Sequence, residues 1–261
     1  MREGRSLDEG AHPDCIEDHP VFRGADRAAL KPLLATLRPR RVAPGALVER
    51  PEQDHCNLVL EGRLHSYVIV AQGRRLLFEI VTAGGVDSLV NVIGDREGHF
   101  TEAVESSVVV PLSRRLIDDL IAADPRIAVN LLNLMLRRID RREVQLESAT
   151  YHETTTRLAR MLLALAHYLG PRTRAPAPTV ELRPRPSHQV LADMLGLRRE
   201  TVTVHLGVLR SIGAVRSAND HLVLDREALR ALIEGDLPDH VGSSPKRRRA
   251  VDGNPLSPGR R

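Results

Sequence analysis

The chain has 261 residues, of which 42% are hydrophobic, and this length allows two modest domains that each bury a core. Its apolar runs are too short to cross a membrane, and residues 1–20 lack the apolar stretch of a signal peptide, so we expect a cytoplasmic protein with no membrane partner. Two cysteines exclude a disulfide framework and a four-cysteine iron–sulfur site, while a net charge of +4, with its basic excess in the C-terminal third, favours a polyanion-binding domain there.

The first part of the chain predicts a disordered segment, a helix and then a series of strands. Residues 1–18 are polar and have no periodicity, whereas residues 22–37 have the apolar spacing of a helix. Between residues 40 and 112, short apolar runs alternate with turn residues such as Pro44-Gly45. Strands at this spacing indicate a small antiparallel barrel or sandwich, which we place at residues 19–123.

The longest helical pattern occupies residues 124–151. It opens at Asp124-Pro125, where the aspartate can cap the helix and the proline fits its first position. Its apolar residues repeat at spacings of three and four, which is typical of a coiled-coil seam. The seam residues are Leu132, Met135, Ile139, Leu146 and Ala149, with Arg142 as an exception among them. The pattern predicts either a dimerisation helix or a helix that packs on its own barrel.

The most specific stretch runs from Ser187 to Gly213 and predicts two helices joined by a tight turn. Ser187 can cap the first helix, and Gly196 can end it in the left-handed conformation. Such a unit fits the DNA major groove, where the first residues of the second helix reach base edges. Short strand patterns on both sides predict a wing, so we place a DNA-binding domain at residues 152–235 and a disordered basic tail at 236–261.

The second helix of this unit carries side chains that suit DNA. Arg199 can pair with guanine, Glu200 can accept from the cytosine amino group, and Val204 can contact a thymine methyl. The predicted base-reading residues are Arg199, Glu200, Thr203 and Val204. The residues predicted at the DNA backbone are Ser187, His188, Gln189, Arg198, Thr201 and His205.

This helix pair resembles that of the Crp-Fnr family (cyclic-AMP receptor protein and FNR) of bacterial transcription regulators in two runs, Leu191-Ala192-x-x-Leu195-Gly196 and Arg199-Glu200-Thr201-Val202. The resemblance implies an α+β fold with an N-terminal cyclic-nucleotide-binding-like β jelly roll, a long dimerisation helix and a C-terminal winged helix-turn-helix. It also implies a homodimer on a pseudo-palindromic double-stranded operator, since two copies are needed to read neighbouring half-sites. RNA polymerase is an open candidate for a further partner.

The sensory pocket departs from the cyclic-AMP-binding members of that family. Phe100 stands about where those members have a phosphate-binding arginine, Glu102 adds a negative charge, and Arg142-Glu143 replaces a small hydroxylated pair. We therefore expect no cyclic-AMP binding of the usual kind and no resident cofactor. Arg142 could meet another anionic ligand, or it could pair with Glu102 or Asp87 and lock the site. The effector-pocket candidates are Asp87, Ser88, Phe100, Thr101, Glu102, Arg142 and Glu143.

No catalytic or metal-ligand motif appears, so we expect a regulator and not an enzyme. The predicted function is sequence-specific DNA binding as a homodimer, with a degenerate pocket that is either ligand-free or takes an effector other than cyclic AMP. Two alternatives stay open. One is a ligand-free architectural protein that recruits a partner. The other is a haem-based gas sensor, because haem iron accepts the ligand types of Cys15, His55, Cys56, His65 and His99.

Overall fold

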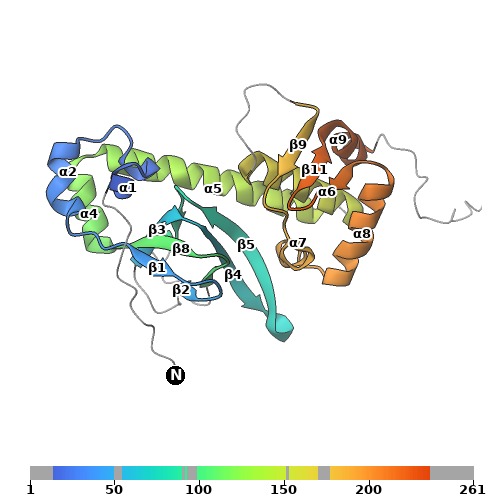
Figure 1. The fold of residues 1–261 in the computed structure, drawn as a ribbon, viewed down its shortest axis with the longest axis horizontal. Helices are drawn as coiled ribbons and strands as arrows, with labels where there is room; N and C mark the ends of the chain where they lie inside the picture. The colour runs from blue at the N-terminus through green and yellow to red at the C-terminus, as the bar shows by residue number, and fades with distance from the viewer. Residues whose placement is uncertain are drawn as a thin grey trace, which may run out of the picture.

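The computed structural model describes residues 14–49, 55–89, 92, 99–150, 153–169 and 177–235. A β-rich N-terminal region and a winged C-terminal region are joined by one long helix, α5 (Arg126–Thr150), as Figure 1 shows. Residues 1–13 and the predicted tail at 236–261 lie outside the described residues. Asp14–Glu17, which the predicted disordered segment includes, form helix α1, and its Ile16 is buried in a core.

The N-terminal region contains two four-stranded antiparallel sheets that face each other, with strand orders β1-β8-β3-β6 and β2-β7-β4-β5. The strands of the first sheet are β1 (Arg40–Val42), β8 (Ser107–Ser113), β3 (His55–Glu61) and β6 (Val86–Asp87). The strands of the second are β2 (Leu47–Glu49), β7 (His99–Ala103), β4 (Arg63–Val70) and β5 (Arg74–Thr82), with the short helix η2 (Ala71–Gly73) between β4 and β5. The apolar run at 101–112 is thus two strands, because the exposed turn at residues 104–106 divides it. The predicted jelly roll is confirmed.

Short helices cover one end of the barrel. They are α1, the single turn η1 (Pro20–Phe22), α2 (Arg27–Leu34) and α4 (Arg114–Ala123). The predicted helix at 22–37 is shorter in the structure because the Asp26 carboxylate caps α2 by accepting from the N–H groups of Ala28 and Ala29. Together with the first half of α5, these helices enclose a core that includes Leu30, Leu120 and Ile127.

Helix α5 presents different faces to the protein and to solvent. Ile127 and Leu131 are buried against the barrel end, and Met135 is partly buried on the same core. On another face, large apolar side chains recur at spacings of three, four, three and seven residues, and each is more than half exposed: Val129, Leu132, Leu136, Ile139 and Leu146. This set is called the apolar stripe below. It passes through Leu136 where the sequence pattern favours Met135, and the side chain of Ala149 lies outside the description.

The C-terminal region is built on α6 (Thr154–Leu169). Its three-stranded sheet has the order β10-β11-β9. The remaining elements are β9 (Thr179–Leu182), α7 (His188–Leu195), α8 (Arg199–Ser211), β10 (Val215–Ser217), β11 (Leu222–Asp225) and α9 (Arg226–Glu234). In Figure 1, α7 and α8 lie beside each other below the wing strands. The predicted winged helix-turn-helix is confirmed.

The two regions are in contact as well as connected. Tyr67, Leu77 and Ile80 of the barrel belong to the same buried core as α6, α7 and α8. The Gln145 amide of α5 donates to the Leu77 carbonyl of β5 (3.1 Å) and to the Met194 carbonyl of α7 (2.9 Å). Among the described residues, no helix has the length and apolar character needed to cross a membrane.

Candidate functional site

The helix-turn-helix is shaped by two local signals that the sequence contains. The Ser187 hydroxyl accepts from the Val190 N–H (3.1 Å) and caps α7. Gly196 ends α7 with φ of 65°, a left-handed conformation in which a side chain is strained. Only two residues then separate this glycine from α8. The turn therefore fixes the angle between the two helices.

Helix α8 divides into a buried and an exposed face. Val202, Leu206 and Leu209 are at most 1% exposed and hold the helix on the core. Arg199, Glu200, Thr203 and Val204 are exposed, and they occupy the first half of the helix. Val204 is 64% exposed although it is apolar. Two charged groups and an apolar group thus stand together on one exposed surface. Side chains of these types read bases in the major groove.

Thr203 is held by its neighbours. Its hydroxyl donates to the Arg199 carbonyl (3.0 Å) and lies 2.7 Å from the His188 Nδ1 of α7. Burial, followed by the charges of Arg210, Arg185 and Arg199, lowers the pKa of His188. Thr203 and His188 therefore connect the two helices in addition to lying on the exposed surface.

The other residues predicted at the DNA backbone have different surroundings. Arg198 is exposed at the start of α8, where no side chain caps the helix, so its charge adds to the positive end of the helix dipole. The Gln189 amide donates to Asp193 (2.7 Å), and Thr201 is half-buried. His205 points inward, with Nδ1 2.8 Å from the Thr155 hydroxyl of α6.

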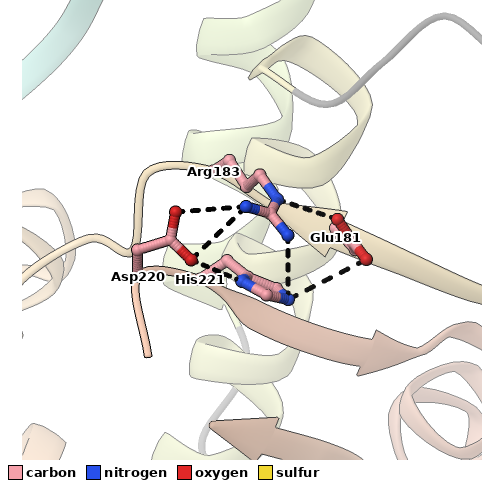
Figure 2. A network of polar contacts seen from close by, with 4 residues as sticks. All are labelled: Glu181, Arg183, Asp220 and His221. Carbon is pink, nitrogen blue, oxygen red and sulfur yellow. Dashed lines mark hydrogen bonds and ion pairs between the residues drawn. The ribbon is translucent and has the colours of Figure 1, made fainter. Parts of the chain in front are cut away.

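A charged network stabilises the wing, as Figure 2 shows. The Arg183 guanidinium donates to Glu181 (2.8 Å) from Nε and to Asp220 (3.1 Å) from Nη1. His221 lies 2.8 Å from Asp220 and 3.8 Å from Glu181. The bond from Arg183 lowers the pKa of Glu181, and the bond from His221 lowers that of Asp220. This network is not evident from the sequence, because the pairing of β9 with β11 brings Asp220 and His221 next to Glu181 and Arg183.

The barrel interior is occupied by polar groups of the chain itself. Asp87 is fully buried, and its carboxylate accepts from Ser66 (2.8 Å), Thr101 (3.1 Å) and Ser88 (2.8 Å). Burial raises the pKa of Asp87 against the opposing effect of these hydroxyls. Ser88 has φ of 58°, which is unusual for a residue other than glycine. Three of the pocket candidates, Asp87, Ser88 and Thr101, thus form one hydrogen-bonded cluster.

The other pocket candidates lie apart from this cluster. Phe100 stacks on the Tyr67 ring, with centroids 5.6 Å apart. Glu102 pairs with Arg75 at 2.8 Å, so its partner is on β5 and not on α5. Arg142 lies over the Phe78 ring, 5.1 Å from its centroid, and Glu143 is exposed.

A buried ion pair that the sequence analysis did not single out joins α5 to the barrel. Arg138 and Glu79 lie 2.5 Å apart, and their side chains are only 8% and 7% exposed. Burial raises the pKa of Glu79, and Arg138 opposes that rise. An arginine in the middle of an otherwise apolar helix face could have pointed to this pair.

The candidate haem ligands are spread over three strands, since His55 and Cys56 lie on β3, His65 on β4 and His99 on β7. Within the part of the chain that the structure describes, no group of three or more His, Cys, Asp or Glu side chains is placed to hold a metal ion. Cys15 lies in α1, and its side chain is outside the description.

Comparison with known proteins shows which family the chain resembles. The model of the Crp-like helix-turn-helix domain matches residues 156–232. The chain is 26% identical over 149 residues to the fumarate and nitrate reduction regulatory protein of Vibrio cholerae, a match that spans 57% of this chain and 58% of that protein. It is 25% identical over 203 residues to a global nitrogen regulator of Synechocystis, which spans 74% of this chain and 86% of that protein.

Solved structures show the same fold. A CooA mutant from Carboxydothermus hydrogenoformans has a TM-score of 0.64 and 19% identity, covering 76% of this chain and 88% of that one. FixK2 from Bradyrhizobium japonicum has a TM-score of 0.62 and 22% identity, covering 76% of this chain and 97% of that one. The helix-turn-helix geometry, the family model over residues 156–232 and these relatives agree, and together they indicate the Crp-Fnr family of DNA-binding transcription regulators.

Proposed function

We propose that this regulator binds a pseudo-palindromic operator as a homodimer and reads its bases with the first half of α8. The observation that carries the proposal is the exposed group of Arg199, Glu200 and Val204 on a helix whose opposite face is completely buried. An exposed arginine there can make the bidentate contact to guanine that gives sequence specificity. Arg198 stands at the uncapped start of the helix, and we assign it to the phosphate backbone.

The apolar stripe on α5 supports the homodimer. From Val129 to Ile139 its spacing of three and four residues is that of a two-helix seam, and the exposed fractions of Leu132 and Ile139 are 58% and 52%. Large apolar side chains that are exposed along one face of a helix favour a partner, because they stay in contact with water in a single copy. A second copy of α5 would cover the stripe and bring two copies of α8 to neighbouring half-sites.

The stripe predicts a loss of dimers when a charge is placed in it. Ile139→Glu should raise the dimer dissociation constant by at least about 100-fold, because two carboxylates would then be buried face to face. Sedimentation velocity measures this, with Arg115→Glu on the exposed surface of α4 as the matched control. A dimer of unchanged affinity would contradict the proposed seam.

The paired polar groups inside the barrel favour a regulator whose DNA binding does not depend on cyclic AMP. Asp87 already has three hydroxyl partners, and Glu79 is paired with Arg138. A cyclic phosphate placed beside these two carboxylates would meet like charges, and the nearby Arg138 is already engaged with Glu79. We therefore propose that DNA binding needs no cyclic nucleotide.

The experiment that tests the function is selection from a random-sequence DNA pool, with and without cyclic AMP. We expect a two-fold-symmetric motif without ligand. Arg199→Ala should then weaken operator binding by about 1–3 kcal/mol and relax one base position, whereas Arg198→Ala should weaken all sequences alike. Equal losses for Arg199→Ala on operator and random DNA would refute its role. Retention of all sequences without a motif would favour the architectural alternative.

A further inference from the structure

A groove outside the barrel lies between α5 and the turn that joins β5 to β6. Its volume is about 540 Å³, which is within the range of small-molecule sites. The turn residues Gly84 and Gly85 line one side of it, and α5 lines the other. Tyr168 of α6 and Pro20 of η1 also line the groove, so four separate parts of the fold meet there.

The charge of the groove is strongly positive. Four arginines line it, Arg23, Arg137, Arg138 and Arg141, against one acid, Glu79. That acid is already paired with Arg138. Arg137 is exposed and has no ion-pair partner among the residues that the structure describes. Among the lining residues the positive charges therefore outnumber the negative ones, although Asp140, which accepts from the Tyr168 hydroxyl, lies beside the groove.

Two of these arginines also have N–H groups without acceptors. Nε and Nη1 of Arg138 and Nε of Arg141 are buried and have no hydrogen-bond partner. The Arg141 guanidinium lies over the Tyr168 ring, 5.3 Å from its centroid. This contact is with the face of the ring, so it gives the guanidinium N–H groups no oxygen or nitrogen acceptor. An acceptor that reached these donors would be stabilised, because a buried N–H without an acceptor is costly. Carboxylates and phosphates are the acceptors that arginine binds best.

The groove is separate from the apolar stripe and from the pocket candidates. Arg137 and Arg141 are four residues apart, so they share one side of α5 with Asn130 and Leu134. Successive residues of a helix are rotated by about 100°, which turns Arg142 and Glu143 toward other sides. A second copy that covers Leu136 and Ile139 would leave the groove open.

We propose that this groove binds a small organic anion with two or more carboxylate or phosphate groups, and that Arg137 and Arg141 contact it directly. The volume admits a molecule larger than a single phosphate ion, and several arginines can engage separate anionic groups of one ligand. The proposal does not rest on DNA binding, since every residue that carries it lies outside the helix-turn-helix.

Isothermal titration calorimetry of the full chain tests this at constant ionic strength, with citrate and inorganic pyrophosphate as the two probes. We expect at least one probe to bind. Arg137→Ala and Arg141→Gln should each weaken that binding at least ten-fold. Arg115→Ala, which removes an exposed arginine of α4, should leave it unchanged. Binding of citrate alone would assign a polycarboxylate, and binding of pyrophosphate alone would assign a polyphosphate.

Three outcomes would overturn the proposal. The first is the absence of binding by both probes. The second is equal binding by the original chain and by Arg137→Ala and Arg141→Gln, with circular dichroism showing that both variants are folded. The third is a loss of binding only in Arg199→Ala, because the anion would then occupy the DNA surface. This last variant also separates the groove from the proposed function, since a failed DNA selection leaves the calorimetry of the groove unaffected.

Discussion

The barrel and the helix-turn-helix use polar residues in opposite ways. In α8 the charged side chains of Arg199 and Glu200 stand in solvent, and the helix is held on the core mainly by its apolar residues. In the barrel and its contact with α5, Asp87, Glu79 and Arg138 are buried; Asp87 accepts from hydroxyls of the chain, and Glu79 pairs with Arg138. Exposed polar groups are available to an external partner, whereas buried ones contribute to the fold. The same residue types therefore indicate recognition at one end of the molecule and architecture at the other.

The largest effect should come from breaking the buried ion pair. Glu79→Ala leaves the Arg138 charge buried without its partner, and we expect the free energy of unfolding to fall by about 3–5 kcal/mol. Urea unfolding measures this. Glu102→Ala is the matched control, because it breaks the more exposed pair with Arg75 and should cost about 1 kcal/mol or less. Equal losses in the two variants would mean that the contrast between buried and exposed polar groups does not hold within the barrel.

The next largest effect on stability is expected from a buried histidine of the N-terminal region. His19 is 4% exposed, its Nδ1 accepts from the Val21 N–H, and its Nε2 lies 3.1 Å from the Gly85 carbonyl. This arrangement suits the neutral ring, and burial lowers its pKa from 6.5 to about 4, against the effect of the bond to Gly85.

The consequence is a dependence of stability on pH. Between pH 6.5 and 4 the unfolded chain takes up a proton at His19 and the folded chain does not, so stability falls as the pH falls. We expect a loss of up to about 3 kcal/mol across that window. His19→Gln should remove this part of the dependence in thermal unfolding, while His167→Gln, on the surface of α6, should keep it. An unchanged slope in His19→Gln would refute the assignment.

The smallest change in stability is expected for an exposed polar side chain of α8. Glu200→Ala removes a polar side chain that lies in solvent, so the free energy of unfolding should change by at most about 0.5 kcal/mol. The same variant should lower operator affinity, as a gel-shift titration would measure. A large loss of stability would show that Glu200 belongs to the fold, contrary to its exposure.

Sequence reasoning succeeded where the determinants are local. The Ser187 cap and the left-handed Gly196 are properties of short segments, and so is the period that buries Val202, Leu206 and Leu209. It failed where the partners come from distant parts of the chain. Glu79 and Arg138 are both charged residues in apolar surroundings, and their burial follows only from the packing of α5 on β5. Met135 and Leu136 are neighbours, and a helix rotation of one residue decides which one the barrel covers.

The amide of Gln145 connects the long helix α5 to both the barrel and the helix-turn-helix. Its nitrogen has two hydrogens, one bonded to the barrel at Leu77 and the other to α7 at Met194. The C-terminal region therefore cannot swing about α5 without giving up one of these bonds. The helix whose outer face suits a second copy thus also ties α7 to the β4–β5 hairpin on its inner side, and this adds a directional contact to the apolar core that the two regions share.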